Sequence, residues 1–281
     1  MLKKIDLARN FLEEHQEQFL CPVCKQYVRL EGYSLVCSKN HHFDLSKKGT
    51  IYFLSHSIQT DYSKEMLQPR GRMIKSGMYQ PLLEKISKSM VQTGNTLDVG
   101  CGEGSFLTEL TDLGLTGAKF GFDLSKEGIY LASNQPIDAF WCVADLTNLP
   151  FADQSMDTVL NIFSPSHYEE FRRVLKKEGT VIKVVPETDY LKELRTAFYP
   201  DDERKQHYSN EKVLTKFSEE MHILENERIS YTFEIPKENR LDLLDMSPLE
   251  WGAASEIKER LKMDPLKTIT IDVRMLKGKV G

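Results

Sequence analysis

The sequence predicts an α/β fold: a doubly wound, mostly parallel sheet with a small metal-binding ribbon at its N-terminal side. Two observations lead to this prediction. From Asn95 onward, buried apolar strands alternate with helical segments, the pattern of a parallel sheet with crossover helices. Before that point, three cysteines and two histidines gather within residues 21–42. A chain of 281 residues can bury one large core and carry a small module beside it.

Four segments are expected along the chain. Residues 1–20 mix acids with bases and contain no apolar run followed by a small-residue cleavage site, so they do not resemble a signal peptide. They are predicted to form an amphipathic helical extension. The ribbon follows at 21–58, a basic linker with a helix at 59–92, and the sheet domain at 93–281. No apolar stretch is long enough to cross a bilayer, and five cysteines is an odd number for a disulfide framework. We therefore expect a cytoplasmic protein without a membrane partner.

Charge is distributed unevenly. The net charge is −5, but residues 21–90 hold 11 basic against 5 acidic residues, whereas residues 91–281 hold 23 against 33. A polyanion would therefore meet the front of the chain. Solvated surface lysines would give the same counts, so charge alone does not decide between the two interpretations.

The cysteines have the spacing of a zinc site. Two residues separate Cys21 from Cys24, twelve separate Cys24 from Cys37, and His41 or His42 comes next. Four thiolate and imidazole ligands make a closed structural zinc site. The residues between are predicted to form two short strands around Gly32, which would bring the two half-sites together. Spacing does not choose between the two histidines.

A glycine loop follows the first strand of the sheet domain. In "LDVGCGEGS", Asp98 ends the strand, and Gly100 and Gly102 flank Cys101 before a helix that begins near Ser105. Glycines let the backbone approach a ligand closely. A dinucleotide enzyme would show G-x-G-x-x-G, and the shifted pattern here favours S-adenosylmethionine instead. Cys101 is expected to fill the turn rather than to react.

Later strands end in acids that suit such a cofactor. Asp123, followed by Leu124, can hold both hydroxyls of a ribose, and Asp145, followed by Leu146, can accept from an adenine amino group. Together with the strand end "NIFSP", their order is typical of class I methyltransferases. Two final strands, in "ERISYTFEI" and "KTITIDVRML", are predicted to form an antiparallel edge.

Over nearly its whole length the chain resembles the RlmA (RrmA) group of 23S rRNA guanine-N1 methyltransferases. The resemblance lies in "CPVC", "MLQPRGRMIKSGMYQPL", "LDVGCGEG", "FGFDLSK", "LPFADQSMD", "EEFRRVLKKEG" and "LLDMSPLEW". It implies a class I (Rossmann-like) sheet and methyl transfer to N1 of a guanine in a hairpin of domain II of 23S rRNA. It also implies that His41 is the fourth zinc ligand.

The resemblance further assigns residues of the cofactor site. Asp98, Gly100 and Gly102 match the methionine-side loop, Asp123 the ribose acid and Asp145 the adenine-side turn. Arg70, Gly77 and Tyr79 match positions beside the cleft. The chain departs from the family at Met78, at Asp189-Tyr190 and at Ser164-Pro165, where the family usually has histidine, a basic pair and Ala-Pro.

The substrate so implied sets the chemistry. Guanine N1 carries a proton near neutral pH, so a base must remove it or donors must stabilise the deprotonated form. Tyr79, Asn161, Phe163 and Pro165 are candidates to line the pocket for the extruded base, with core packing as the alternative for each. No residue is identified as the general base.

The residues alone leave two other functions open. One is a small-molecule methyltransferase with a structural ribbon, and the other is a module that binds S-adenosylmethionine without transferring its methyl group. The first would lack a basic face of Lys47, Lys48, Arg70, Arg72 and Lys75 at the cleft. The sequence also leaves open whether the protein is a homodimer.

Overall fold

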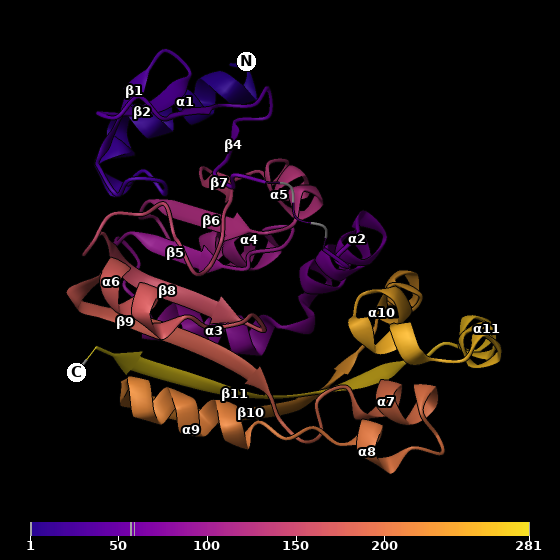
Figure 1. Ribbon diagram of the computed structural model, residues 1–281. Coiled ribbons are helices and arrows are strands. Elements are labelled where there is room, and N and C mark those ends of the chain that lie inside the picture. The colour runs from indigo at the N-terminus through magenta and orange to yellow at the C-terminus, as the bar shows by residue number, and fades with distance from the viewer. Residues whose placement is uncertain (1, 57, 59, 281) are drawn as a thin grey trace.

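The computed structural model describes residues 2–56, 58 and 60–280; positions 1, 57, 59 and 281 lie outside the described residues. Position 59, where the linker is expected to begin, is thus not described. Figure 1 shows the N-terminal module above a twisted sheet, with the C-terminal strands at the opposite end. The module contains α1 (Lys4–His15), η1 (Gln16–Gln18), β1 (Val28–Glu31), β2 (Ser34–Cys37), β3 (His42–Asp44) and β4 (Thr50–Tyr52).

A linker of helices leads into the sheet. It comprises α2 (Lys64–Met73), the π-helical turn η2 (Ile74–Met78) and α3 (Gln80–Ser89). Gly77 has φ +91°, in the left-handed region that favours glycine, and the chain turns there between α2 and α3. Tyr79 follows this turn directly.

The doubly wound, mostly parallel sheet is confirmed. Among the described residues it has eight strands in the order β10-β11-β9-β8-β5-β6-β7-β4. The two final strands, β10 and β11, pair antiparallel at one edge of the sheet, as predicted, and β11 is also antiparallel to β9. The strands are β5 (Thr96–Val99), β6 (Lys119–Asp123), β7 (Phe140–Val143), β8 (Met156–Ile162), β9 (Leu175–Pro186), β10 (His222–Glu234) and β11 (Thr268–Lys279).

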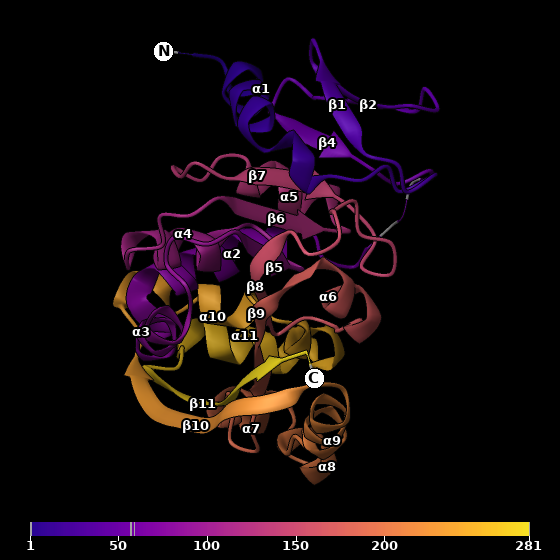
Figure 2. The ribbon, with the colours of Figure 1, turned by 90° about the vertical axis from the view of Figure 1, so that its left-hand side faces the viewer.

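Helices cover both faces of the sheet. Figure 2 shows α3 and α4 on one side of β5 and α6 on the other, and a separate apolar core lies on each side. No helix of the described chain is both long and apolar enough to span a bilayer. The remaining helices are α4 (Ser105–Asp112), α5 (Lys126–Ala132), α6 (Tyr168–Val174), α7 (Lys192–Phe198), α8 (Glu203–Gln206), α9 (Glu211–Glu220), η3 (Lys237–Asn239), α10 (Asp242–Asp245), η4 (Pro248–Gly252) and α11 (Ser255–Met263).

Several boundaries differ from those expected. The third strand ends at Val143, two residues before Asp145. The pairing of β9 with β8 is irregular around Gly179, because the partner on β9 moves from Leu175 to Thr180 while β8 advances only from Met156 to Thr158. The segment from Arg240 to Met263 contains three short helical pieces, α10, η4 and α11, because Pro248 can start but not continue a helix and Gly252 weakens one.

The N-terminal module is joined to the sheet rather than set apart from it. β4 pairs in parallel with β7, with Ile51 opposite Cys142. Phe19, which is fully buried, packs against Phe120, Phe140 and Phe151, with ring centroids 5.3–5.8 Å apart. Residues before the predicted start of the sheet domain therefore complete both its edge and its core.

Candidate functional site

The loop after β5 has a backbone that requires glycine. Gly100, Gly102 and Gly104 have φ values of +66°, +54° and +81°. A Cβ on Gly100 would lie 2.8 Å from Cβ of Ser164, and one on Gly104 would lie 2.7 Å from the Trp141 ring. The backbone of the loop is thereby brought close to the end of β8, as the sequence pattern indicates.

A cavity of about 320 Å³ opens above this loop. Gly100, Gly102, Asp123, Leu124 and Leu146, all predicted cofactor residues, line it together with Phe163 and Pro165, which were predicted for the target pocket. The carboxyl ends of β5, β6, β7 and β8 thus meet at one place, as parallel strands require. Arg70 also lines the cavity, and its guanidinium lies 5.6 Å from the centroid of Phe106.

Sequence reasoning missed part of the lining. Tyr62 and Leu67 reach the cavity from the segment before and within α2, and Ser125 Oγ donates to the carbonyl of Tyr62 at 3.2 Å. The sequence signal for Leu67 is its spacing of four residues from Gly71, which puts both on one face of the helix. That face lies against the loop, since a Cβ added to Gly71 would lie 3.1 Å from Glu103. The linker helix therefore packs directly on the glycine loop.

Asp123 shapes the loop as well as the cavity. Its Oδ2 accepts from the Gly102 N–H at 2.9 Å, and its Oδ1 accepts from the Ser125 N–H at 2.8 Å. Burial raises the pKa of Asp123, and these N–H groups together with Arg70 act in the opposite direction. Each carboxylate oxygen keeps a lone pair for a further donor, so the ribose hydroxyls of a cofactor fit here.

Asp98 is a second buried acid, 2% exposed, beneath the loop. Burial raises its pKa to about 7, against the attraction of Arg70. Its Oδ2 has no hydrogen-bond partner among the described residues. An orphaned buried carboxylate oxygen is costly and suits a positively charged donor from a ligand, such as the ammonium of S-adenosylmethionine.

Asp145, Tyr79 and Cys101, like Asp98 and Asn161, are predicted site residues that do not line this cavity. Asp145 Oδ1 accepts from the N–H and the hydroxyl of Thr147, both at 2.8 Å. Tyr79 is 2% exposed. Cys101 is buried too, and burial raises the pKa of its thiol well above the ordinary value, in keeping with a filler of the turn.

Asn161 is fully buried beneath the loop after β8. Its amide nitrogen donates to the hydroxyl of Ser164 at 2.6 Å and to the carbonyl of Pro165 at 2.8 Å. The side chain therefore holds the loop that carries Phe163 and Pro165. Phe163 has φ +55°, a strained conformation for a non-glycine residue.

The cysteines and one histidine converge in the ribbon. Cys21, Cys24, Cys37 and His41 offer ligand atoms that all lie within 4.8 Å of one another. Cys24 and Cys37 sulfurs are 3.6 Å apart, and His41 Nδ1 lies 3.3 Å from Cys37 Sγ and 3.4 Å from Cys21 Sγ. Ligands about 2.3 Å from a tetrahedral zinc would be separated by about 3.7 Å, so the donor set fits the ion.

The second histidine points elsewhere. His42 Nε2 lies 3.1 Å from Asn40 Oδ1, whereas the His41 N–H donates to Cys37 Sγ at 3.4 Å. Although burial acts to raise it, N–H groups of His41 and Lys39 lower the pKa of Cys37 to about 6. A low thiol pKa favours the thiolate that a metal binds.

Three of the five basic residues considered from the sequence have identified neighbours, and Arg72 and Lys75 line one surface pocket together. Arg70 points into the cavity, Arg72 binds Asp242 at 2.6 Å, and Lys48 lies 4.9 Å from the centroid of Tyr130. A nearby acid and a nearby aromatic ring thus offset part of the positive charge of the linker and the ribbon.

Known protein families match both the sheet domain and the N-terminal ribbon of this chain. A family model described as "Methyltransferase domain" matches residues 97–183, and one described as "RlmA, N-terminal" matches residues 19–57. YxjB of Bacillus subtilis (strain 168), whose name gives it a provisional 23S rRNA (guanine-N(1)-)-methyltransferase activity, is 39% identical over 92% of this chain and 96% of its own length.

More distant proteins are also similar. The 23S rRNA (guanine(748)-N(1))-methyltransferase of Streptomyces fradiae is 28% identical over 62% of this chain and 65% of its own length. The crystal structure of the PH0226 protein from Pyrococcus horikoshii OT3 covers 80% of this chain and 97% of its own, with 18% identity and a TM-score of 0.48.

Proposed function

The chain belongs to the family of 23S rRNA guanine-N1 methyltransferases with an RlmA-type zinc ribbon, and we propose that it methylates N1 of a guanine in a domain II hairpin of 23S rRNA. The observation that carries the proposal is the match to YxjB along 96% of that protein. This chain also combines a four-ligand metal cluster with a cavity of the size and lining expected for the cofactor, as the proposal requires.

S-adenosylmethionine is the methyl donor of such enzymes, and its sulfonium makes the methyl group electrophilic. We infer that Asp123 holds the ribose, Asp98 faces the ammonium group, and Gly100 and Gly102 let the backbone approach it. Leu124 and Leu146 would contact the adenine side. Asp145, Cys101 and Tyr79 lie outside the cavity lining, and their contact with the cofactor stays a prediction. Cys21, Cys24, Cys37 and His41 would hold the zinc.

Phe163 and Pro165 would meet the target base at the cavity wall. An extruded guanine needs an apolar face for stacking, and both side chains border the cofactor cavity. Asn161 contributes by holding this loop rather than by proton transfer, since its amide is already bonded to it. Burial raises the pKa of Tyr79 well above its ordinary value, so the phenol is a poor base near neutral pH. The N1 proton is then released to solvent water, and orientation of the guanine beside the methyl donor is the main source of rate.

The test is primer extension on unmodified 23S rRNA incubated with the protein and S-adenosylmethionine. Methylation at guanine N1 blocks base pairing, so we expect a single new stop within domain II. Asp123→Ala should weaken cofactor binding by about 1 to 3 kcal/mol and remove the stop. A wild-type protein that leaves the transcript unmodified would refute the proposal.

Two further points belong to the proposal. We propose a cytoplasmic location, which an rRNA substrate requires and which the odd number of five cysteines favours. A homodimer stays a prediction, and sedimentation of the purified full chain tests it.

A further inference from the structure

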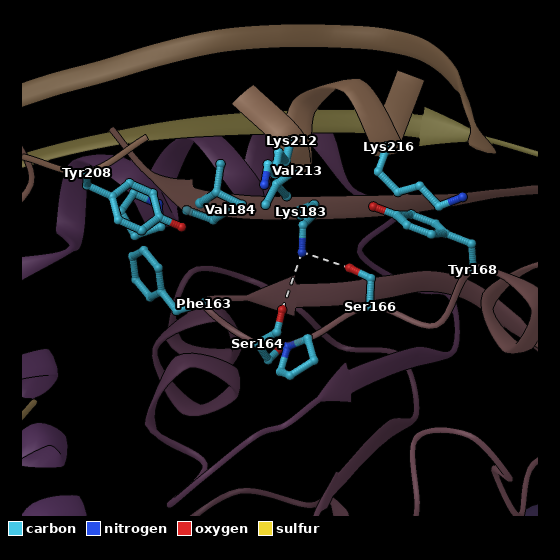
Figure 3. A pocket seen from close by; sticks show the side chains of 13 residues that line it. Phe163, Ser164, Ser166, Tyr168, Lys183, Val184, Tyr208, Lys212, Val213 and Lys216 are labelled. Atoms are coloured by element: carbon cyan, nitrogen blue, oxygen red, sulfur yellow. Dashed lines mark hydrogen bonds between the residues drawn. The ribbon is translucent and has the colours of Figure 1, made fainter. Parts of the chain in front are cut away.

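A second cavity, of about 460 Å³, lies on the other side of the loop that follows β8 (Figure 3). Phe163, Ser164 and Pro165 line both this cavity and the cofactor cavity. The two spaces therefore share a wall only one loop thick. The other walls come from β9 and α9, with Tyr168 and Tyr208 at the sides.

At the base of this second cavity is a buried lysine. Lys183 is 3% exposed, and its Nζ donates to Asn161 Oδ1 at 2.6 Å and to Ser166 Oγ at 2.8 Å, with the Ser164 carbonyl at 3.3 Å. All three acceptors are neutral. Within the described residues no carboxylate pairs with Lys183, and burial lowers its pKa to about 8. A buried ammonium without a counter-charge is unfavourable, and an anion in the cavity would relieve that cost.

Two more lysines line the cavity from α9, although Figure 3 shows the ammonium end of Lys216 directed outward past Tyr168. Lys212 and Lys216 stand four residues apart on α9, so they project from one side of the helix, where like charges repel. Lys216 pairs with Glu220 at 2.5 Å, but that acid also binds Arg172. Lys212 has no ion pair among the described residues. The 13 residues that line the cavity include three lysines and no acid.

Hydroxyl groups complete the set of donors. Figure 3 shows the hydroxyl ends of Tyr168 and Tyr208 directed inward from opposite sides. The Ser166 hydroxyl, at the base beside Lys183, already donates to Asn161 Oδ1 at 2.7 Å, so the two tyrosines are the hydroxyl donors in question. Ammonium and hydroxyl groups are common partners of nucleic-acid phosphates. The cavity is therefore chemically suited to a phosphate, in a domain whose overall charge would repel one.

We propose that this cavity binds an RNA phosphodiester next to the guanine that receives the methyl group, an inference that rests on the proposed rRNA substrate. Lys183 supplies a buried charge, and Lys212 and Lys216 supply charges at the helix. Because the cavity shares the Phe163–Pro165 wall with the cofactor cavity, a phosphate held there would anchor the strand close to the reacting base.

The experiment compares Lys212→Gln with Lys177→Gln, which removes an equal charge from an exposed site near the other end of β9. Binding of an unmodified 23S rRNA transcript to the full chain is measured by filter retention at several salt concentrations. Lys212→Gln should weaken binding about three- to tenfold and reduce the slope of log K against log[salt] by about 0.7 to 0.9. Lys177→Gln should match the wild type, and neither variant should alter S-adenosylmethionine affinity.

Lys183→Met gives a second, stronger loss if the variant folds; Lys212→Gln decides the matter if it does not. Equal affinities and slopes for Lys212→Gln and Lys177→Gln, with a wild type that still methylates the transcript, would overturn this inference alone. A wild type that does not methylate it would overturn the proposed function instead. Inorganic phosphate that stabilises the wild type but not Lys212→Gln, with RNA slopes unchanged, would assign the cavity to a free anion and overturn the RNA role.

Discussion

The hydroxyl oxygens of Tyr79 and Tyr190 lie 2.6 Å apart and share a hydrogen bond. Tyr79 follows the turn at Gly77, and Tyr190 lies in the segment between β9 and α7. The Tyr190 ring stacks on Phe163 at 5.4 Å between centroids, and Tyr79 lies 5.6 Å from the same ring. The pair therefore supports the strained loop that separates the two cavities. The resemblance led us to expect a basic residue at this position, and Tyr190 instead has a structural use there.

Removal of one hydroxyl should cost more than removal of both. Tyr190→Phe keeps the stack on Phe163 but leaves the buried Tyr79 hydroxyl without that partner, so we expect a loss of about 1 to 3 kcal/mol in the free energy of unfolding. The double variant with Tyr79→Phe should recover part of it. Urea unfolding of the wild type, the two single variants and the double variant measures this double-mutant cycle. Strictly additive losses would show that the two hydroxyl groups contribute independently.

Zinc content should follow one histidine only. We expect Cys37→Ser and His41→Ala to lose the metal, because a closed tetrahedral site needs all four ligands. His42→Ala is the matched control, since this side chain contacts Asn40 instead. Metal analysis of the purified variants provides the measurement. A full zinc complement in the His41 variant would contradict the assignment.

Asp98 should make the cofactor-free protein less stable as pH rises. Its folded pKa of about 7 lies above the ordinary value near 4, so the folded state keeps a proton that the unfolded state loses. Stability should fall between about pH 4 and pH 7 and level off above, by up to about 4 kcal/mol. Asp98→Asn should remove this part of the pH dependence. Thermal unfolding of both proteins from pH 4 to 8 tests it, and parallel curves would rule it out.

The same titration should affect cofactor binding in the opposite sense. An ionised Asp98 attracts a cationic ammonium group, so S-adenosylmethionine affinity should rise with pH up to about 7, by at most about tenfold per unit. Calorimetry at pH 6 and pH 8 measures the change. In Asp98→Asn the affinity should be weaker and nearly independent of pH; a variant with the wild-type profile would exclude Asp98 from the site.

Phe19 should stabilise the whole protein, although it belongs to the N-terminal module. Because its fully buried ring packs on Phe120, Phe140 and Phe151, Phe19→Ala should cost about 3 to 5 kcal/mol. Tyr27→Ala, at a ring that is 64% exposed on the ribbon, is the control and should cost little. Urea unfolding followed by circular dichroism should give one transition. Two separate transitions would mean that the module unfolds independently.

The zinc cluster and the glycine loop could be predicted because each depends on local sequence. Cys21 and Cys24 reach one ion because a single turn separates them, and Gly100 and Gly102 adopt positive φ because they lack a Cβ. Such features need no knowledge of distant contacts. The choice between His41 and His42 was different: spacing left it open, and only the resemblance and then the geometry favoured His41.

Long-range contacts were decided by the tertiary structure. The pairing of β4 with β7 and the burial of Phe19 against the sheet join residues about one hundred positions apart, and no local pattern specifies such partners. The assembly of Lys183, Lys212 and Lys216 around one cavity has the same origin. Along the chain each is one more lysine in an acidic domain, and only the tertiary structure brings the three to the lining of one cavity, which includes no acid.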